Sequence, residues 1–429
     1  MRRHHCITGI DIGSQTIRIA VLEWNRSFEL PRLISLVKRP SAGMKRGAVV
    51  DADMVAQELR KAFHEVKKTI GIRPDHAYIA QGEARMSMHV ARGTVAVARP
   101  DGEITPEDVR RVVAASEDAL ARFSNREIIH TFPRFFHVDR DLFVHDPVGM
   151  NGMKLETETL FVSAFTPHLR SLVRAAEQAG IMPDDVIAST LASAHVLLSK
   201  KQREIGCLLL DIGADTSNVS VWEENKPYSF EVIPLGSGHI TQDIALAFQI
   251  DVETAEKVKR AHASLSEDGS TPYEIRLAEF HGTGRPLGEP RHSAGRAQKE
   301  DRSEEVISHR KLQEIVSARF SDIFELTDKH LKKVGRSGLL PGGVVLAGGG
   351  ARINGLLPLA RRELKLPVEF CEPQTEFFDD PQRLFSDSLY HVALGAALWG
   401  MEEEQKHRRG FLYYLLPPRF TRIIQAFIP

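Results

Sequence analysis

The chain has 429 residues, 42% of them hydrophobic and 26% charged, and a formal net charge of -1. This composition is typical of a globular protein with several folded units, and it provides no general field that would attract nucleic acid. Its three cysteines (Cys6, Cys207 and Cys371) lie far apart without metal-ligand spacing, which argues against a disulfide framework or a zinc site. The absence of a long apolar run predicts a cytoplasmic protein with no transmembrane helix.

An internal repeat is the most informative feature of the sequence. Residues 7–21 contain an apolar strand, an Asp-Ile-Gly turn that begins at Asp11, and a second strand rich in β-branched residues. Residues 207–221 repeat this order, with the turn beginning at Asp211. One such hairpin is a weak signal, but two of them, each opening one half of the chain, predict two related lobes that face each other.

The elements between the two hairpins alternate in type. Helical spacing predicts a helix over residues 53–70, and alternating β-branched residues predict strands within 77–98. Thr105 is a predicted helix cap, followed by proline and acidic residues in the first turn. Further strands are expected at 128–138 and 157–165. Together these elements predict a small α/β unit inserted into the first half.

The second half ends with a glycine-bearing segment. Residues 264–305 are rich in Gly, Pro, Ser, His and charged residues and predict surface loops, after which a helix is expected over 306–334. Residues 344–364 then predict a strand, a Gly-Gly-Gly turn that starts at Gly348, and a helix. Glycine allows close approach of the backbone to a flat ligand, although the same turn can serve only as a tight connection. The last body helix is expected at 388–400.

The two hairpins and the glycine turn together predict a nucleotide site. Backbone N–H groups of the hairpins can hold phosphate oxygens, and carboxylates can hold a magnesium ion through its waters. Asp11 and Asp211 occupy equivalent strand ends, so they can face one metal ion from two sides of a cleft. The chain contains no GxxxxGK[ST] sequence, which excludes a P-loop.

These three segments resemble the two phosphate motifs and the adenosine motif of the actin, Hsp70 and sugar-kinase superfamily. Within it, the chain is most similar to the FtsA family of bacterial cell-division proteins, over nearly its whole length. The likeness extends to residues 203–211, to 232–248 with its Thr-x-Asp-Ile-Ala core, and to the AExxKxxH helix at 255–262. Residues 104–109 and 146–152 look like the inserted 1C subdomain that FtsA shares with PilM.

The resemblance implies an α/β, actin-like, two-lobed fold with duplicated ATPase-type halves and an FtsA-type inserted 1C subdomain. The implied layout is a first lobe core (1A) at 1–75 and 165–200, the 1C subdomain at 76–164, a second lobe core (2A) at 201–237 and 342–400, a second lobe small subdomain (2B) at 238–341, and a linker and tail at 401–429.

The resemblance also implies that ATP and Mg²⁺ bind between the lobes. The residues expected to contact the nucleotide are Asp11, Gly13, Ser14, Gln15, Thr16, Asp211, Gly213, Ala214, Asp215, Thr216, Gly236, Glu256, Lys259, Gly348, Gly349, Gly350 and Arg352, and the expected metal ligands are Asp11 and Asp211. The second hairpin departs from the DIGGGTTD sequence common in relatives, because Ala214, Asp215 and Asn218 replace two glycines and an acid. An Asp215 carboxylate can repel phosphate or help to hold the metal, and Asn218 removes an acidic group that could activate water. We therefore expect ATP binding with slow or absent hydrolysis, and assign no catalytic residue.

The carboxyl-terminal segment has an amphipathic pattern. After a polar run at 401–407, large apolar residues recur at helical spacing on one face, and two arginines on the other side suit anionic lipid headgroups. The expected membrane-binding residues are Phe411, Leu412, Leu415, Leu416, Phe420, Ile423, Ile424, Phe427 and Ile428. FtsA proteins end in a similar helix, usually after a longer linker. The alternative is a terminal helix that docks on the protein itself or on a partner subunit.

The implied function is a membrane-tethered, polymerising adaptor at the cytoplasmic face of the cell membrane. By the resemblance, the 2B subdomain binds the carboxyl-terminal peptide of FtsZ, and the 1C subdomain mediates self-assembly into filaments and recruits later divisome proteins; no nucleic-acid partner is expected. Two alternatives remain open from the sequence. One is a PilM-like pilus-assembly scaffold, and the other is a small-molecule kinase on the same fold, for which no catalytic base or substrate pocket is evident.

Overall fold

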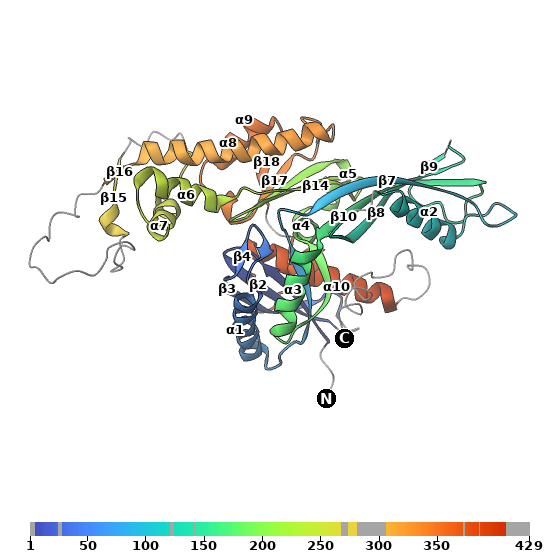
Figure 1. Cartoon of the computed structure of the whole chain (residues 1–429), viewed down its shortest axis with the longest axis horizontal. Helices are drawn as coiled ribbons and strands as arrows, with labels where there is room; N and C mark the ends of the chain where they lie inside the picture. Colours follow the sequence, from blue (N-terminus) through green and yellow to red (C-terminus); the bar gives the residue numbers. More distant parts are fainter. Residues whose placement is uncertain are drawn as a thin grey trace, which may run out of the picture.

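The computed structural model describes residues 5–24, 28–120, 124–140, 142–266, 273–280, 306–371, 374–385 and 387–408. The chain forms two lobes, each built on a five-stranded sheet, and a smaller four-stranded unit that extends from them to one side (Figure 1).

The first lobe contains a mixed sheet with strand order β11-β6-β1-β2-β3. Its strands are β1 (His5–Ile12), β2 (Thr16–Trp24), β3 (Arg32–Pro40), β6 (His76–Gln81) and β11 (Met182–Ala188), and its helices are α1 (Ala52–Ile70), α3 (Thr166–Gln178) and α4 (Ser189–Leu197). Helix α1 agrees with the prediction: Asp51 caps it by accepting from the Met54 N–H, and it ends at Gly71, whose φ of 76° suits glycine. A short hairpin, β4 (Met44–Lys45) and β5 (Ala48–Val49), lies beside the sheet.

The inserted unit is an antiparallel sheet with one covering helix. Its strand order is β7-β10-β8-β9, formed by β7 (Ser87–Ala96), β8 (Arg126–Val138), β9 (Leu142–Val144) and β10 (Lys154–Phe165), and α2 (Pro106–Asp118) packs on β7 and β10. The predicted cap is present, because Thr105 and Asp108 form a reciprocal capping box. The predicted boundary at residue 76 falls too early, since β6 pairs in parallel with β1 in the first lobe.

The second lobe repeats the arrangement of the first. Its sheet has the order β14-β13-β12-β17-β18, with β12 (Cys207–Ile212), β13 (Ser217–Glu223), β14 (Lys226–Ile233), β17 (Val344–Ala347) and β18 (Val368–Phe370). In each lobe an antiparallel hairpin is followed by a third antiparallel strand, and the first strand also pairs in parallel with a strand from later in the chain. Its helices are α5 (Lys200–Ile205), α6 (Ser237–Phe248), α7 (Val252–His262), α8 (His309–Lys333) and α9 (Leu356–Leu364).

The region predicted as loops contains a short strand in its described part. Strand β15 (Glu274–Arg276) pairs with β16 (Val306–Ser308), so the helix expected from residue 306 begins only at His309, where Ser308 caps it. Sequence periodicity alone does not reveal this two-stranded ladder, because its strands are three residues long and far apart in the sequence.

Helix α10 (His391–Arg408) corrects two predictions. It was assigned to the second lobe core, but it packs against β1, β2, β6 and α4 of the first lobe. The contact is close: a Cβ on Gly9 would lie 2.0 Å from the carbonyl oxygen of Ala393, so only glycine fits there. The helix also continues through residues 401–408, which were expected to be linker. Among the helices in the described ranges, none combines the length and hydropathy needed to cross a bilayer.

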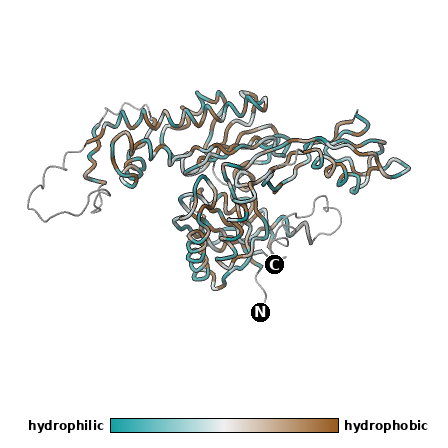
Figure 2. Tube along the Cα trace, in the orientation of Figure 1, coloured by the Kyte–Doolittle hydropathy of each residue, from teal (hydrophilic) through white to brown (hydrophobic). Residues whose placement is uncertain are grey.

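The buried strands pack on both faces of the second sheet. Leu208 and Leu210 of β12 contact the core beneath α8 and α9, while Cys207 and Leu209 on the opposite face join the core shared with the first lobe. The hydrophobic colouring in Figure 2 is accordingly concentrated inside the first lobe and along the central strands. The carboxyl ends of β1 and β12 lie close together at the boundary between the lobes.

Candidate functional site

A cavity of about 520 Å³ lies where the two lobes meet. All of the residues predicted to contact a nucleotide line it except Gly236. Gly236 instead caps α6, and a Cβ there would lie 2.6 Å from the carbonyl oxygen of Ala214, so its place in the structure is explained by backbone packing. A ligand cavity of this size is within the usual range for cofactor sites.

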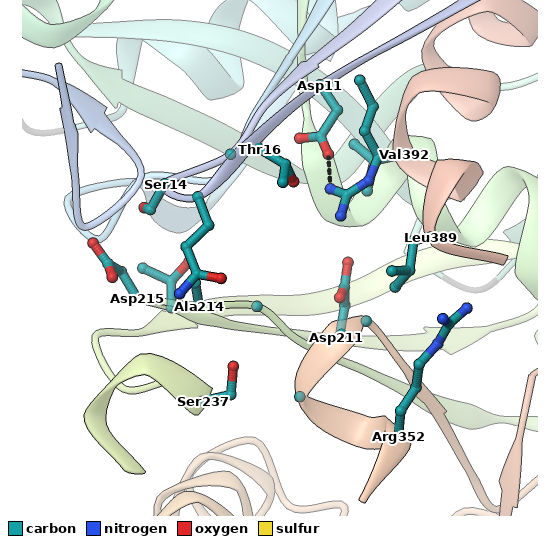
Figure 3. Close-up of a pocket in the computed structure, with 18 of the residues that line it drawn as sticks. Asp11, Ser14, Thr16, Asp211, Ala214, Asp215, Ser237, Arg352, Leu389 and Val392 are labelled. Carbon is teal, nitrogen blue, oxygen red and sulfur yellow. Dashed lines mark hydrogen bonds and ion pairs between the residues drawn. The ribbon is translucent and has the colours of Figure 1, made fainter. Parts of the chain in front are cut away.

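The first hairpin places Asp11 and three turn residues on the cavity wall. Asp11 is in the last pair but one before the turn of the β1–β2 hairpin, and the Gly13 N–H donates to the Thr16 carbonyl at 3.0 Å to close the turn. Arg18, directly opposite Asp11 on β2, donates from Nη1 to the Asp11 carboxylate at 3.2 Å (Figure 3). Burial raises the pKa of Asp11, and the Arg18 guanidinium opposes that rise.

The second hairpin reproduces this turn in the other lobe. The Gly213 N–H donates to the Thr216 carbonyl at 2.9 Å, and Asp211 is opposite Asn218 in the strand ladder. Asp211 accepts from His391 Nε2 at 3.0 Å and from Ser193 Oγ at 3.4 Å. Asp11 and Asp211 face each other across the cavity in Figure 3.

The buried pair of Asp211 and His391 concentrates charge beside the cavity. Burial acts to raise the pKa of Asp211, but the adjacent His391 imidazole holds that pKa below its ordinary value. Burial likewise opposes protonation of His391, yet the Asp211 carboxylate raises the pKa of the imidazole. The Ser388 carbonyl accepts from His391 Nδ1 at 2.8 Å, which fixes the ring at the start of α10. His391 lines the cavity, and no local sequence pattern predicted it.

The glycine turn approaches the second hairpin so closely that side chains are excluded. Gly348 has a φ of 86° and a ψ of 169°, a region almost restricted to glycine. A Cβ on Gly348 would lie 2.3 Å from Asp211 Oδ1, and a Cβ on Gly350 would lie 2.5 Å from the Ile212 side chain. The turn thus forms the floor of the cavity beside Asp211.

Helices α6 and α7 supply a polar network at one end of the cavity. Lys259 Nζ contacts the Glu256 carboxylate at 2.6 Å and donates to Thr241 Oγ1 at 2.7 Å and to the Ser237 carbonyl at 2.9 Å. Burial lowers the pKa of Lys259, although Glu256 supports its charged form. At the other end, Arg352 forms an ion pair with Asp387 and donates to Ser388 Oγ at 2.9 Å.

Asp215 and Asn218, where the second hairpin departs from the sequence common in relatives, have different environments. Asp215 Oδ2 accepts from the backbone N–H of Arg46 in the other lobe at 2.8 Å. Asn218 lines the cavity with an Oδ1 atom that is buried and has no hydrogen-bond partner within the described structure. Gly82 packs against this amide, since a Cβ there would lie 3.0 Å from Asn218 Oδ1.

The cavity also includes residues that the sequence did not single out. They come from the ends of elements in both lobes: Arg18, Lys38, Gly82, Ser189, Ser237, Arg260, Asp387, Leu389 and His391. In the first lobe, Gly82 directly follows β6, which pairs in parallel with β1, as Gly348 directly follows β17, which pairs in parallel with β12. The predicted membrane-binding residues of the tail, Phe411 to Ile428, lie outside the described residues.

Two family models match the chain. The model for cell division protein FtsA matches residues 208–395, and the model for the SHS2 domain inserted in FtsA matches residues 84–163. The cell division protein FtsA of Pseudomonas aeruginosa is 27% identical, over 93% of this chain and 90% of that protein. The FtsA of Bacillus subtilis is 28% identical, over 92% and 84%, respectively.

Solved structures support the same architecture. The PilM–PilN type IV pilus biogenesis complex contains a chain with a TM-score of 0.63 and 19% identity, covering 92% of this chain and 98% of that one. MreB5 of Spiroplasma citri, solved bound to ADP, has a TM-score of 0.54 and 14% identity, covering 95% and 99%. These likenesses, together with the inserted unit, confirm the predicted actin-like, two-lobed α/β fold with an FtsA-type insertion.

Proposed function

Because the chain belongs to the FtsA family of bacterial cell-division proteins, we propose that it binds ATP between its lobes, associates with the cytoplasmic face of the cell membrane and anchors FtsZ there. Cell division is the process in which its relatives are named. The observation that carries the nucleotide part is that both hairpin turns and the glycine turn line one cavity.

The cavity residues suit a nucleoside triphosphate. The turns at Gly13 and Gly213 bring backbone to opposite sides of the cavity, where N–H groups can hold phosphate oxygens. Gly349 and Gly350, with Glu256 and Lys259, lie on the walls suited to the nucleoside. Lys38, another charged residue that lines this cavity, can offset phosphate charge.

Asp11 and Asp211 are the proposed holders of Mg²⁺, which would neutralise phosphate charge. They face each other across the cavity, and their charges interact. In the described parts of the chain no group of three or more His, Cys, Asp or Glu side chains is arranged to hold a metal. Two carboxylates fit magnesium nevertheless, because this ion usually keeps several of its waters and binds through one or two carboxylates plus phosphate oxygens.

We propose that hydrolysis is weak or absent. Asp11 is paired with Arg18, and Asp211 is paired with His391, so each of these carboxylates already interacts with a cationic partner. Asn218 presents an amide to the cavity, and an amide is not a general base.

The nucleotide proposal is tested by titrating a fluorescent ATP analogue with and without EDTA. The wild-type protein should bind it, and chelation should weaken binding. The variant D11A should bind weakly and lose its dependence on Mg²⁺, because one proposed ligand is gone. Unchanged, Mg²⁺-dependent binding by D11A would contradict the metal role of Asp11, and no binding by the wild type would contradict the nucleotide site.

By analogy with the family, the 2B subdomain at 238–341 is the proposed receptor for the carboxyl-terminal peptide of FtsZ, and the inserted unit is proposed to support self-assembly and recruitment of later divisome proteins. An immobilised FtsZ tail peptide should retain the protein, and a scrambled peptide of the same composition should not. Equal retention on both peptides would contradict specific recognition.

The tail is proposed to bind membrane as an amphipathic helix. Burying each large apolar side chain contributes about 1.5–3 kcal/mol before ordering costs. The five that recur at helical spacing therefore suffice for reversible binding: Phe420, Ile423, Ile424, Phe427 and Ile428. The full-length protein should sediment with anionic liposomes, and a variant lacking residues 411–429 should stay in the supernatant. This result would also separate the adaptor from a PilM-like scaffold. A full-length protein that remains soluble beside anionic vesicles would refute the tether.

A further inference from the structure

The mouth of the cavity is bridged by a hydrogen bond between the lobes. Asp215, in the second hairpin, uses Oδ2 to accept from the backbone N–H of Arg46 at 2.8 Å. Figure 3 shows its carboxylate pointing away from Asp11 and Asp211. Asp215 also lines an adjoining cavity of about 640 Å³, so it lies where the two cavities meet. Its side chain is therefore directed across the opening and away from the proposed metal ligands.

The Arg46 N–H is held firmly by the first lobe. Arg46 and Gly47 form the two-residue turn of the β4–β5 hairpin, with φ values of 50° and 75°. This conformation is the tight turn that favours glycine and directs the strands into register. The Arg46 carbonyl accepts from the Ala84 N–H at 3.2 Å, and the Gly47 N–H donates to Ser14 Oγ at 3.3 Å. Gly47 is pressed against Gly82, whose carbonyl oxygen would lie 2.2 Å from an added Cβ.

Asp215 is held equally well by the second lobe. The turn that carries it is closed by the bond from the Gly213 N–H to the Thr216 carbonyl, and the Gly238 N–H donates to the neighbouring Ala214 carbonyl at 2.7 Å. Two well-anchored turns, one from each lobe, thus meet through one exposed hydrogen bond. The lobes cannot separate at this point without breaking it.

Some other contacts between the lobes lie deeper, whereas Arg352 of the second lobe forms an exposed ion pair with Asp387, just before α10. Thr216 Oγ1 donates to the Gly82 carbonyl at 3.4 Å, and His391 of α10 contacts Asp211. Asp215 is only partly exposed but belongs to the rim, whereas Asp211 and His391 are buried. The bond between Asp215 and Arg46 thus joins the two lobes at an exposed edge of the cavity.

We propose that Asp215 and the Arg46–Gly47 turn form a latch that closes the cavity and limits the rate at which its ligand leaves. The role of this latch in nucleotide exchange rests on the proposed function. The carboxylate serves as a hydrogen-bond acceptor between lobes, which is distinct from repelling phosphate or holding a metal. An amide at the same position keeps an acceptor oxygen but removes the charge, so the two kinds of role are separable.

The test uses D215G, which removes the acceptor, and D215N, which retains one. Release of a fluorescent ATP analogue, chased with unlabelled ATP, should be roughly three- to tenfold faster in D215G, the effect expected from losing one charge-assisted hydrogen bond at a partly exposed site. D215N, which keeps an acceptor oxygen, should release the analogue more slowly than D215G. Equal acceleration in both variants would show that charge, not the latch, is responsible, and would overturn the proposal.

A second measurement needs no nucleotide. Hydrogen exchange of the Arg46 amide, read by mass spectrometry on the segment containing 44–47, should be faster in D215G than in D215N or the wild type. Unchanged exchange in D215G would overturn the latch even if ATP binds. Faster exchange in D215G, with no nucleotide bound by any variant, would support the latch as an interlobe contact and refute the proposed nucleotide function instead.

Discussion

The glycine turn that starts at Gly348 allows a quantitative test of how the cavity floor is built. The substitution G348A adds one methyl group where the backbone has a φ of 86°, and that methyl would lie 2.3 Å from Asp211 Oδ1 and 2.5 Å from the Ile212 carbonyl oxygen. A non-glycine residue in such a conformation costs about 1–3 kcal/mol. The overlap adds to this cost, because the turn or the Asp211 carboxylate must move. We expect G348A to lower the free energy of unfolding by about 2–4 kcal/mol.

Gly349 provides a control within the same turn. Its φ is not in the positive region, and an added Cβ would meet only Leu389 Cδ2 at 3.9 Å, an ordinary contact. G349A should therefore remain within about 0.5 kcal/mol of the wild type. Both values are obtained from urea unfolding of the nucleotide-free protein, followed by circular dichroism. Equal stabilities of G348A and G349A would refute the reasoning, since they differ in backbone conformation and in the atoms that the new methyl group meets.

Three further outcomes are expected. H391A should lose about 3–5 kcal/mol of stability by urea unfolding, because it leaves Asp211 as a buried charge without its histidine partner; a loss below about 1 kcal/mol would contradict that pairing. Burial lowers the pKa of His130 to about 3, so below about pH 6.5 this histidine binds a proton in the unfolded chain but not in the folded protein. The free energy of unfolding should therefore fall by up to about 1.4 kcal/mol per pH unit between about pH 6 and 4, and more steeply in the wild type than in H130Q. Parallel pH profiles of the two proteins would exclude His130 as the cause. The Tyr228 ring lies between the guanidinium groups of Arg134 and Arg336, at 4.4 and 4.2 Å from its centre. Y228A should therefore destabilise the contact between the inserted unit and the second lobe by about 2–4 kcal/mol, whereas Y228F, which keeps the ring, should stay near the wild type. Similar thermal melting of the two variants would argue against the ring contacts.

The repeat made the core of the fold predictable. Asp11 and Asp211 are separated by two hundred positions, but each follows an apolar strand and precedes a glycine, and the local hairpin chemistry is the same in both. Such signals lie within a dozen residues, so a single sequence reveals them. The helix cap at Thr105 was predictable for the same reason, because its partner Asp108 is three residues away.

The long-range partners were not predictable. His391 reaches Asp211 from a helix that begins 180 residues later, and nothing in its neighbours distinguishes it from an ordinary core histidine. Helix α10 was predicted as a helix, but its place on the first lobe depends on close contact with glycines that are distant in sequence, such as Gly9. The bond between Arg46 and Asp215 involves a backbone N–H, which any residue except proline possesses, so residue type carries no signal for it.

The return of α10 to the first lobe has a mechanical consequence. Helix α10 packs against β1, β2, β6 and α4 of the first lobe, and His391 in its first turn contacts Asp211 of the second lobe. A pulling force applied beyond Arg408 therefore enters the molecule through the first lobe and is spread over that lobe's sheet. The second lobe then receives this load through contacts such as the His391–Asp211 pair beside the cavity.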